Sequence, residues 1–126
     1  MQPDTLRLRL AAILGLTAVW LGALGAHGKV HDMIKAAGKL ETWETAVSYQ
    51  LPHAILLVAL ALLGTAGGRL GSWAWRFLFL GVLLFCGSLY LQAYTLVKWL
   101  VYVTPFGGVS LMAGWGLLIF SKWTRA

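Results

Sequence analysis

The side chains of this sequence that could do chemistry gather in residues 44–53, which read Glu-Thr-Ala-Val-Ser-Tyr-Gln-Leu-Pro-His. The segment offers a carboxylate (Glu44), a phenol (Tyr49), an amide (Gln50) and an imidazole (His53), and it leads directly into an apolar run. Polar groups carried into apolar sequence need a reason, which is either a binding site or a structural joint. What they can do together depends on the elements that position them.

The spacing of the charged residues indicates an integral membrane protein. The 126 residues are 60% hydrophobic and 11% charged, against about 25% charged in ordinary soluble domains. Four long uncharged stretches, of 19, 24, 21 and 23 residues, follow one another: 10–28, 45–68, 77–97 and 99–121. A helix needs roughly 20 mostly apolar residues to cross a bilayer. The sequence therefore predicts an all-α membrane protein with four transmembrane helices.

We expect a single domain, 1–126, whose spans cover residues 8–26, 52–68, 73–97 and 105–120. An amphipathic helix over residues 33–51 should lie in the membrane interface between the first two spans. Its apolar residues recur at three- and four-residue spacing and form one narrow stripe: Leu40, Trp43, Val47 and Leu51. Pro52 lacks a backbone donor, so it should kink the helix where the chain turns into the bilayer.

The first two spans each need an interpretation. The first follows two arginines and imitates a secretory signal, but its small residues recur at helical spacing, so we interpret it as a retained span that packs against another helix. The second would rise only roughly 18 Å if it ended at Leu63. We therefore expect residues 64–68 to complete the crossing and residues 69–72 to form the next turn.

The basic residues indicate an orientation. One side of the membrane would hold Arg7, Arg9, Arg69, Arg76, Lys122 and Arg125, and the other Lys29, Lys35, Lys39 and Lys98. The positive-inside rule then places both termini in the cytoplasm. The net charge is +6, but the basic residues lie mainly at the ends of the spans. This distribution indicates membrane anchoring and topology signals and argues against nucleic-acid binding.

Counting along straight helices brings His27 and His53 to similar depth. His27 is 18 residues beyond the last arginine before its span, or roughly 27 Å. His53 is 16 residues before the arginine that follows its span, or roughly 24 Å. Consecutive helices usually pack side by side, so the two imidazoles could meet near the outer face. Tyr49 and Gln50, one turn before His53, could join them.

Two interpretations of this cluster stay open. The two imidazoles could bind a haem or metal ion or relay protons. Alternatively, His27 ends the first span and His53 hydrogen-bonds across helices, which fixes the hairpin. Two histidines without a recognised ligand motif do not specify a metal, and the cofactor stays unknown. Glu44 lies roughly 13 Å along the helix from His53, so it should pair with His27, His31 or a loop lysine.

The rest of the sequence indicates packing and not catalysis. Spans three and four carry Gly, Ser, Thr and Gln, residue types that let helices approach and hydrogen-bond. No nucleophile with a base or phosphate loop is recognisable, so we expect no enzyme. The leading hypothesis is a protein that acts in the lipid bilayer by association, as a homo-oligomer or an accessory subunit. The alternatives are a cofactor-, lipid- or small-molecule-binding protein and a small transporter.

Four motifs occur in an order that is familiar: GALGAHG (22–28), WETAVSYQLPHA (43–54), GSLY (87–90) and TPFGG (104–108). In these the chain resembles the YgdD/YwdK-type family of small bacterial inner-membrane proteins, a family of unknown function. The family usually has phenylalanine where Leu24 and Trp43 stand, and more often an aromatic residue where Pro52 stands. The resemblance covers nearly the whole chain and implies a four-helix bundle in a bacterial cytoplasmic membrane. It supplies no catalytic residues.

Overall fold

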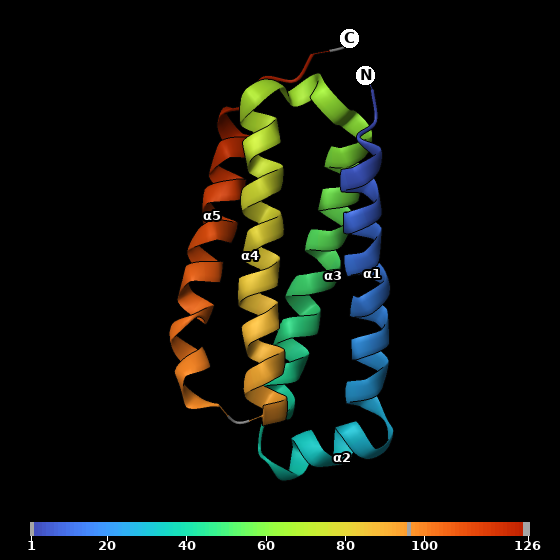
Figure 1. Ribbon diagram of the computed structural model, residues 1–126, viewed down its shortest axis with the longest axis vertical. Coiled ribbons are helices and arrows are strands. Elements are labelled where there is room, and N and C mark those ends of the chain that lie inside the picture. Colours follow the sequence, from blue (N-terminus) through green and yellow to red (C-terminus); the bar gives the residue numbers. More distant parts are fainter. Residues whose placement is uncertain (1, 96, 125–126) are drawn as a thin grey trace.

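The computed structural model describes residues 2–95 and 97–124, and within them every regular element is helical. The elements are α1 (Thr5–Ala26), α2 (Gly28–Ala36), α3 (Leu40–Leu63), the 3₁₀ turn η1 (Gly64–Gly67), α4 (Gly68–Thr95), the 3₁₀ turn η2 (Lys98–Tyr102) and α5 (Thr104–Phe120). The four long helices α1, α3, α4 and α5 run side by side, and α2 crosses one end (Figure 1). Both chain ends lie at the opposite end.

Three continuous stretches of the described residues are long and apolar enough to cross a membrane: Thr5–Ala26, Leu40–Thr95 and Lys98–Phe120. The middle stretch has 56 residues, more than twice what one crossing requires. The turn η1 reverses it, so that α3 and α4 lie antiparallel and in contact. Glycine makes this reversal possible, because Gly64 and Gly68 have φ of 60° and 64°, values that residues with a side chain rarely adopt.

Residues 28–63 form two helices with a turn between them, whereas the sequence predicted one interfacial helix over 33–51 followed by a span. A short helix, α2, ends at Ala36, and Gly38 turns the chain with φ of 71°. Helix α3 then begins at Leu40 and continues through Pro52 to Leu63. The proline removes only one backbone donor, and the helix on both sides of it is buried along one face, at Trp43, Ala46, Gln50, Ala54 and Leu57.

This division also moves the expected turn. Because α3 has 24 residues, it rises roughly 36 Å without help from the glycine-rich segment after it. Residues 64–67 therefore form the turn itself, and residues 69–72, expected as the turn, are the first residues of α4.

Close packing follows the order of the chain, with α1 on α3, α3 on α4 and α4 on α5. The indole of Trp43 fills the space beside Gly25 and donates a hydrogen bond of 2.9 Å from Nε1 to the Leu21 carbonyl of α1. In α5, Gly107 lies against the backbone of Phe85, where a Cβ atom could not fit. The core between the helices is apolar, with Leu57, Leu78 and Val82 fully buried.

Both chain ends are fastened at the η1 end. The Asp4 N–H donates to the Ala61 carbonyl at 2.8 Å, and the Thr124 N–H donates to the Ala66 carbonyl at 2.9 Å. The Asp4 side chain caps α1 by accepting from the Arg7 N–H at 3.0 Å. Arg7 in turn donates from Nη2 to Ser72 Oγ at 2.9 Å, which ties α1 to α4.

Candidate functional site

Helix α3 carries polar side chains on two of its faces near its middle. Gln50 faces α1 and α4 and is 3% exposed, whereas the exposed Tyr49 packs on Phe85 of α4 and the half-buried His53 contacts Trp115 of α5. The sequence placed these residues in one cluster because they are close along the helix. The structure separates them into an interior network and a peripheral pair.

The interior network centres on the Gln50 amide. Its Nε2 donates to the Leu14 carbonyl at 2.9 Å and to Thr17 Oγ1 at 2.8 Å, both on α1. The Tyr90 hydroxyl of α4 donates to Gln50 Oε1 at 2.6 Å. Both amide hydrogens and the amide oxygen are thus engaged, as a buried polar group in apolar surroundings requires. The network joins three helices through one side chain.

The peripheral pair consists of His53 and Trp115. Trp115 Nε1 donates to His53 Nε2 at 3.1 Å, and His53 Nδ1 lies 2.7 Å from the Tyr49 carbonyl oxygen. Because an indole N–H can only donate, Nε2 is the acceptor, and the imidazole proton must be on Nδ1, where it donates to Tyr49. Both nitrogens of a neutral ring are therefore occupied. Binding a metal or haem iron through His53 would require Trp115 to give up its bond.

His27 lies elsewhere. It is the exposed residue that ends α1, and its backbone N–H donates to the Ala23 carbonyl at 3.2 Å. Gln50 contacts the carbonyl of Leu14, so the middle of α3 is level with the middle of α1. His27 is thirteen residues beyond Leu14, roughly 20 Å along the helix. The structure does not bring the two histidines together, because α3 begins at Leu40 and not at Pro52, which puts His53 in its middle.

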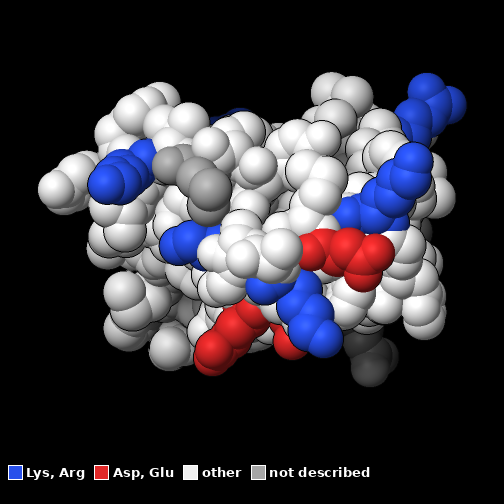
Figure 2. Space-filling view, turned by 90° about the horizontal axis from the view of Figure 1, so that it is seen from below, with Lys and Arg blue, Asp and Glu red and all other residues white. Residues whose placement is uncertain are grey.

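Glu44 is exposed near the start of α3 and borders a small groove against α1. Among the described residues one ion pair forms, between Arg7 Nε and Asp4 Oδ2 at 3.5 Å, so the structure does not show the expected pairing of Glu44 with a histidine or loop lysine. His31 instead places Nδ1 2.7 Å from the Gly25 carbonyl oxygen. Acidic and basic side chains are interspersed over this end of the molecule (Figure 2).

Metal ligands do not converge in the part of the chain that is described: no group of three or more His, Cys, Asp or Glu side chains is placed to hold an ion.

A groove of about 180 Å³ runs between α1 and α4, with the Gln50 network at its floor. Its lining residues are Leu14, Thr17, Leu21, Gln50, Val82, Leu83, Cys86, Gly87 and Tyr90. Gly87 is notable here, because a Cβ atom built on it meets no neighbouring atom within 4 Å. At this glycine the groove wall above the interior network is open to an approaching group.

Comparison with known proteins identifies the family. The family model described as "Protein of unknown function (DUF423)" matches residues 21–108. The chain belongs to the DUF423 family.

Relatives of this DUF423 protein are named as membrane proteins. It is 38% identical to the UPF0382 membrane protein SH2409 of Staphylococcus haemolyticus, over 89% of this chain and 90% of the relative. It is 38% identical to YwdK of Bacillus subtilis, over 87% and 89% of the two chains. It is 40% identical to YgdD of Escherichia coli, named an inner membrane protein, over 86% and 82%. The expected resemblance is confirmed, and no solved structure matches.

Sequence reasoning missed the partners that complete both polar clusters of this DUF423 chain. Thr17 and Tyr90 bind Gln50, and Trp115 binds His53. A usable signal was present for Gln50, because an amide in a membrane helix needs partners at the same depth. Nothing in the sequence pointed to Trp115, since its contact depends on which side of α4 helix α5 packs.

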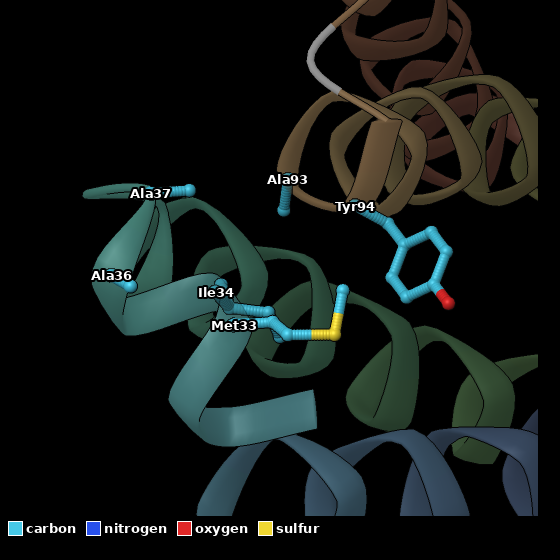
Figure 3. Close-up of a pocket in the computed structure, with 6 residues that line it drawn as sticks. All are labelled: Met33, Ile34, Ala36, Ala37, Ala93 and Tyr94. Atoms are coloured by element: carbon cyan, nitrogen blue, oxygen red, sulfur yellow. The ribbon is translucent and has the colours of Figure 1, made fainter. Parts of the chain in front are cut away.

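Two further clefts lie at the α2 end. One, of about 440 Å³, is enclosed by α2 and the last turns of α4 and has an apolar lining apart from Tyr94. There Met33 extends toward the Tyr94 ring while Ala93 faces the gap (Figure 3). The other, of about 410 Å³, is lined by Lys39, Gln92, Val97, Lys98 and Val101.

Proposed function

We propose that this DUF423 protein acts by association and not by catalysis, as a homo-oligomer or as an accessory subunit of a membrane complex. The contact would be made by a transmembrane helix, in the simplest case from a second copy, seated in the groove between α1 and α4. The observation that carries this proposal is Gly87, which lines the groove and faces open space.

Glycine inside a helix is unfavourable by about 1 kcal/mol relative to alanine, unless close packing compensates. Three other glycines of α4 and α5 have that compensation, since an added Cβ would meet the neighbouring helix at under 3 Å: Gly81, Gly107 and Gly114. Gly87 has none among the described residues; the same is true of Gly116, but Gly87 also lines the α1–α4 groove. Small residues at membrane depth are the positions where helix backbones approach one another, so a helix from outside would supply the missing contact.

The surroundings of Gly87 suit a helix. Leu83, one turn earlier on α4, is 46% exposed, and Leu14 and Leu21 of α1 form the opposite wall. The polar atoms beneath are already bonded to one another, so an apolar partner can cover them without leaving a donor unpaired. The groove thus favours van der Waals packing over recognition of a polar ligand.

A lipid or other small molecule is the alternative occupant of such a groove. The alternative based on His27 and His53 has less support, because those residues lie far apart along the helices and His53 is already bonded on both nitrogens. A transporter would normally need an ionisable side chain along its path, and the groove lining contains no Asp, Glu, Lys, Arg or His.

We also propose that α1, α3, α4 and α5 each cross the cytoplasmic membrane of a bacterium, with both termini in the cytoplasm. Their lengths of 22, 24, 28 and 17 residues agree with the range of about 17–25 or more needed for a crossing. Every described arginine lies within the first nine residues of α1 or α4, and both helices begin at the end of the bundle that holds the termini. Arg125, counted with them, lies outside the described residues.

The association is tested by measuring the mass of the purified protein in mild detergent by native mass spectrometry. The matched variants are Gly87→Leu and Gly116→Leu, because both glycines face open space and lie on different helices. We expect the wild type and Gly116→Leu to give the same oligomer or complex, and Gly87→Leu to be monomeric with an unchanged melting temperature.

A strictly monomeric wild type without a co-purifying protein would contradict the proposal. If Gly87→Leu instead removed a bound lipid or other small molecule from the spectrum, the small-molecule alternative would replace it. The topology is tested by labelling single cysteines with a membrane-impermeant reagent in a Cys86→Ala background. Label at residue 35 but not at residue 122 of intact cells is the expected result, and the reverse would overturn it.

A further inference from the structure

A basic cleft lies at the α2 end, away from the α1–α4 groove. Three segments form it: Lys39 at the start of α3, Gln92 in the last turn of α4, and the connection to α5 with Val97, Lys98 and Val101. Its volume is about 410 Å³. The lining therefore combines two ammonium groups, one amide and two apolar side chains.

The two lysines are available for a ligand. Neither forms an ion pair with a carboxylate among the residues that the structure describes. Lys98 is exposed and Lys39 half-buried, and the cleft lining holds no acidic side chain to neutralise them. Gln92 is fixed in place, since its Nε2 donates to Thr104 Oγ1 at 2.8 Å. The cleft thus carries two positive charges on a wall that is otherwise neutral.

The opposite end of the molecule offers a useful contrast. A cleft of about 500 Å³ there is lined by Arg7, but also by Asp4. The guanidinium already contacts Asp4 at 3.5 Å, donates to Ser72 and lies 5.0 Å from the centre of the Trp75 ring. Its charge is committed inside the chain, so that cleft has no spare cation for a ligand.

We propose that the cleft of Lys39 and Lys98 binds the headgroup phosphate of an anionic phospholipid. The cleft lies at the end of the long helices, where α3 begins and α4 ends, and this is the level of a bilayer at which headgroup phosphates lie. Lysine binds phosphate as a compact point charge, and basic residues near a membrane surface each contribute about 1 kcal/mol of attraction to anionic lipid. Val97 and Val101 provide apolar surface for the glycerol backbone and first methylenes of the lipid.

The place of the cleft at the ends of the long helices favours a lipid over a peptide or a nucleic acid. A lipid approaches within the membrane plane and can place a phosphate between the lysines while its chains stay in the hydrocarbon region. The same end also carries Lys29 and Lys35 on α2, which do not line the cleft. These two residues distinguish a specific site from general attraction to a basic surface.

The experiment measures lipid binding to the full chain by native mass spectrometry, with phosphatidylglycerol and phosphatidylcholine of identical chains as probes. The double variant Lys39→Gln/Lys98→Gln is compared with Lys29→Gln/Lys35→Gln, which loses the same charge at the same end. We expect the wild type to prefer phosphatidylglycerol. The cleft variant should bind it about 10- to 30-fold more weakly, and the α2 variant should bind nearly as well as the wild type.

Equal weakening by the two double variants would overturn the proposal, because the effect would then be one of overall charge. Equal binding of the two lipids by the wild type would overturn it as well. Inorganic phosphate is a third probe: if it bound the cleft as well as the lipid did, the site would recognise free phosphate and the lipid assignment would be wrong. Melting temperatures in phosphatidylcholine check folding, and Lys98→Gln alone, at an exposed position, provides a fallback that should show part of the loss.

Discussion

The two hairpins of this DUF423 protein hold their helices together by different chemistry. In the α1–α3 pair, side chains of α3 donate to backbone carbonyls of α1, from Trp43 to Leu21 and from Gln50 to Leu14. In the α4–α5 pair, glycines remove side-chain volume so that the helices touch, as Gly107 does against Phe85, and Ser110 Oγ of α5 adds a hydrogen bond of 2.7 Å to the Phe77 carbonyl of α4. Both contacts include hydrogen bonds, but close approach of the two backbones at several glycines is the distinctive feature of the α4–α5 contact.

Both pairs of helices must associate inside a membrane, and they do so in different ways. Inside a membrane, apolar side chains gain little from leaving lipid for protein, so helices associate through hydrogen bonds or through close van der Waals packing. The hairpins are joined to each other mainly along α3 and α4, where Trp75 Nε1 donates to the Leu57 carbonyl at 3.1 Å and Tyr90 binds Gln50. The bond of His53 with Trp115 adds a link at the periphery.

The largest effect is expected from Gln50→Ala, which removes the centre of the hydrogen-bonded contact. Three bonds at about 0.6–1.7 kcal/mol each are lost, together with packing, so the free energy of unfolding should fall by about 2–4 kcal/mol. Unfolding in mixed micelles with increasing dodecyl sulfate measures it. Gln92→Ala is the control, because that amide makes one hydrogen bond at the edge of the molecule. Equal losses for the two variants would show that the interior network has no special weight.

Gly107→Ala tests the contact that depends on proximity. Its new methyl group would collide with the Phe85 backbone, so α5 must shift, and overpacking of this kind lowers stability by about 1–3 kcal/mol. Gly108→Ala is the matched control on the neighbouring residue, since a Cβ there meets the Phe85 ring at 3.8 Å, an ordinary contact. The same unfolding assay should separate the two variants. If both were neutral, close approach would not be what holds α5.

The number of long helices and their apolar character could be predicted from the spacing of charges alone. Four uncharged stretches predicted four spans, and the described residues contain four long helices within three continuous apolar stretches, with boundaries shifted by the position of the turn. The error came from Pro52, which was expected to separate an interfacial helix from a span. A proline inside a helix removes one bond, and burial of Trp43 and Gln50 on one face outweighs that loss.

The candidate site could be predicted only in part, for a related reason. The sequence singled out Gln50 as a candidate binding residue and the structure places it in the interior network, but the prediction grouped it with His53, three residues away. Side chains three positions apart on a helix point in somewhat different directions. Here that difference directs Gln50 toward α1 and His53 toward α5. The prediction that His27 meets His53 was wrong because their depths were counted from Arg9 and Arg69. The place of Arg69 depends on where the chain turns between α3 and α4. Tertiary packing, which the sequence does not state, decided both.

The smallest effect is expected from Trp115→Phe, which tests the peripheral link between α3 and α5. Phenylalanine keeps a ring near His53, where the Trp115 ring now meets the imidazole edge-on at 5.9 Å between centroids, but it cannot donate a hydrogen bond. One partly exposed bond in a membrane protein is worth about 0.6 kcal/mol, so the loss of stability should be below about 1 kcal/mol.

A second readout shows whether the bond exists at all. Nitrogen-15 NMR of His53 should report an imidazole with its proton on Nδ1 in the wild type, and the Nε2 signal should move in Trp115→Phe because that nitrogen loses its donor. Trp20→Phe, at an exposed tryptophan of α1, should leave the signal unchanged. If Trp115→Phe lost more stability than Gly107→Ala, the ranking of the two contacts would be reversed. The attachment of α5 would then depend more on hydrogen bonding than on close backbone approach, and the contrast between the two hairpins would not hold.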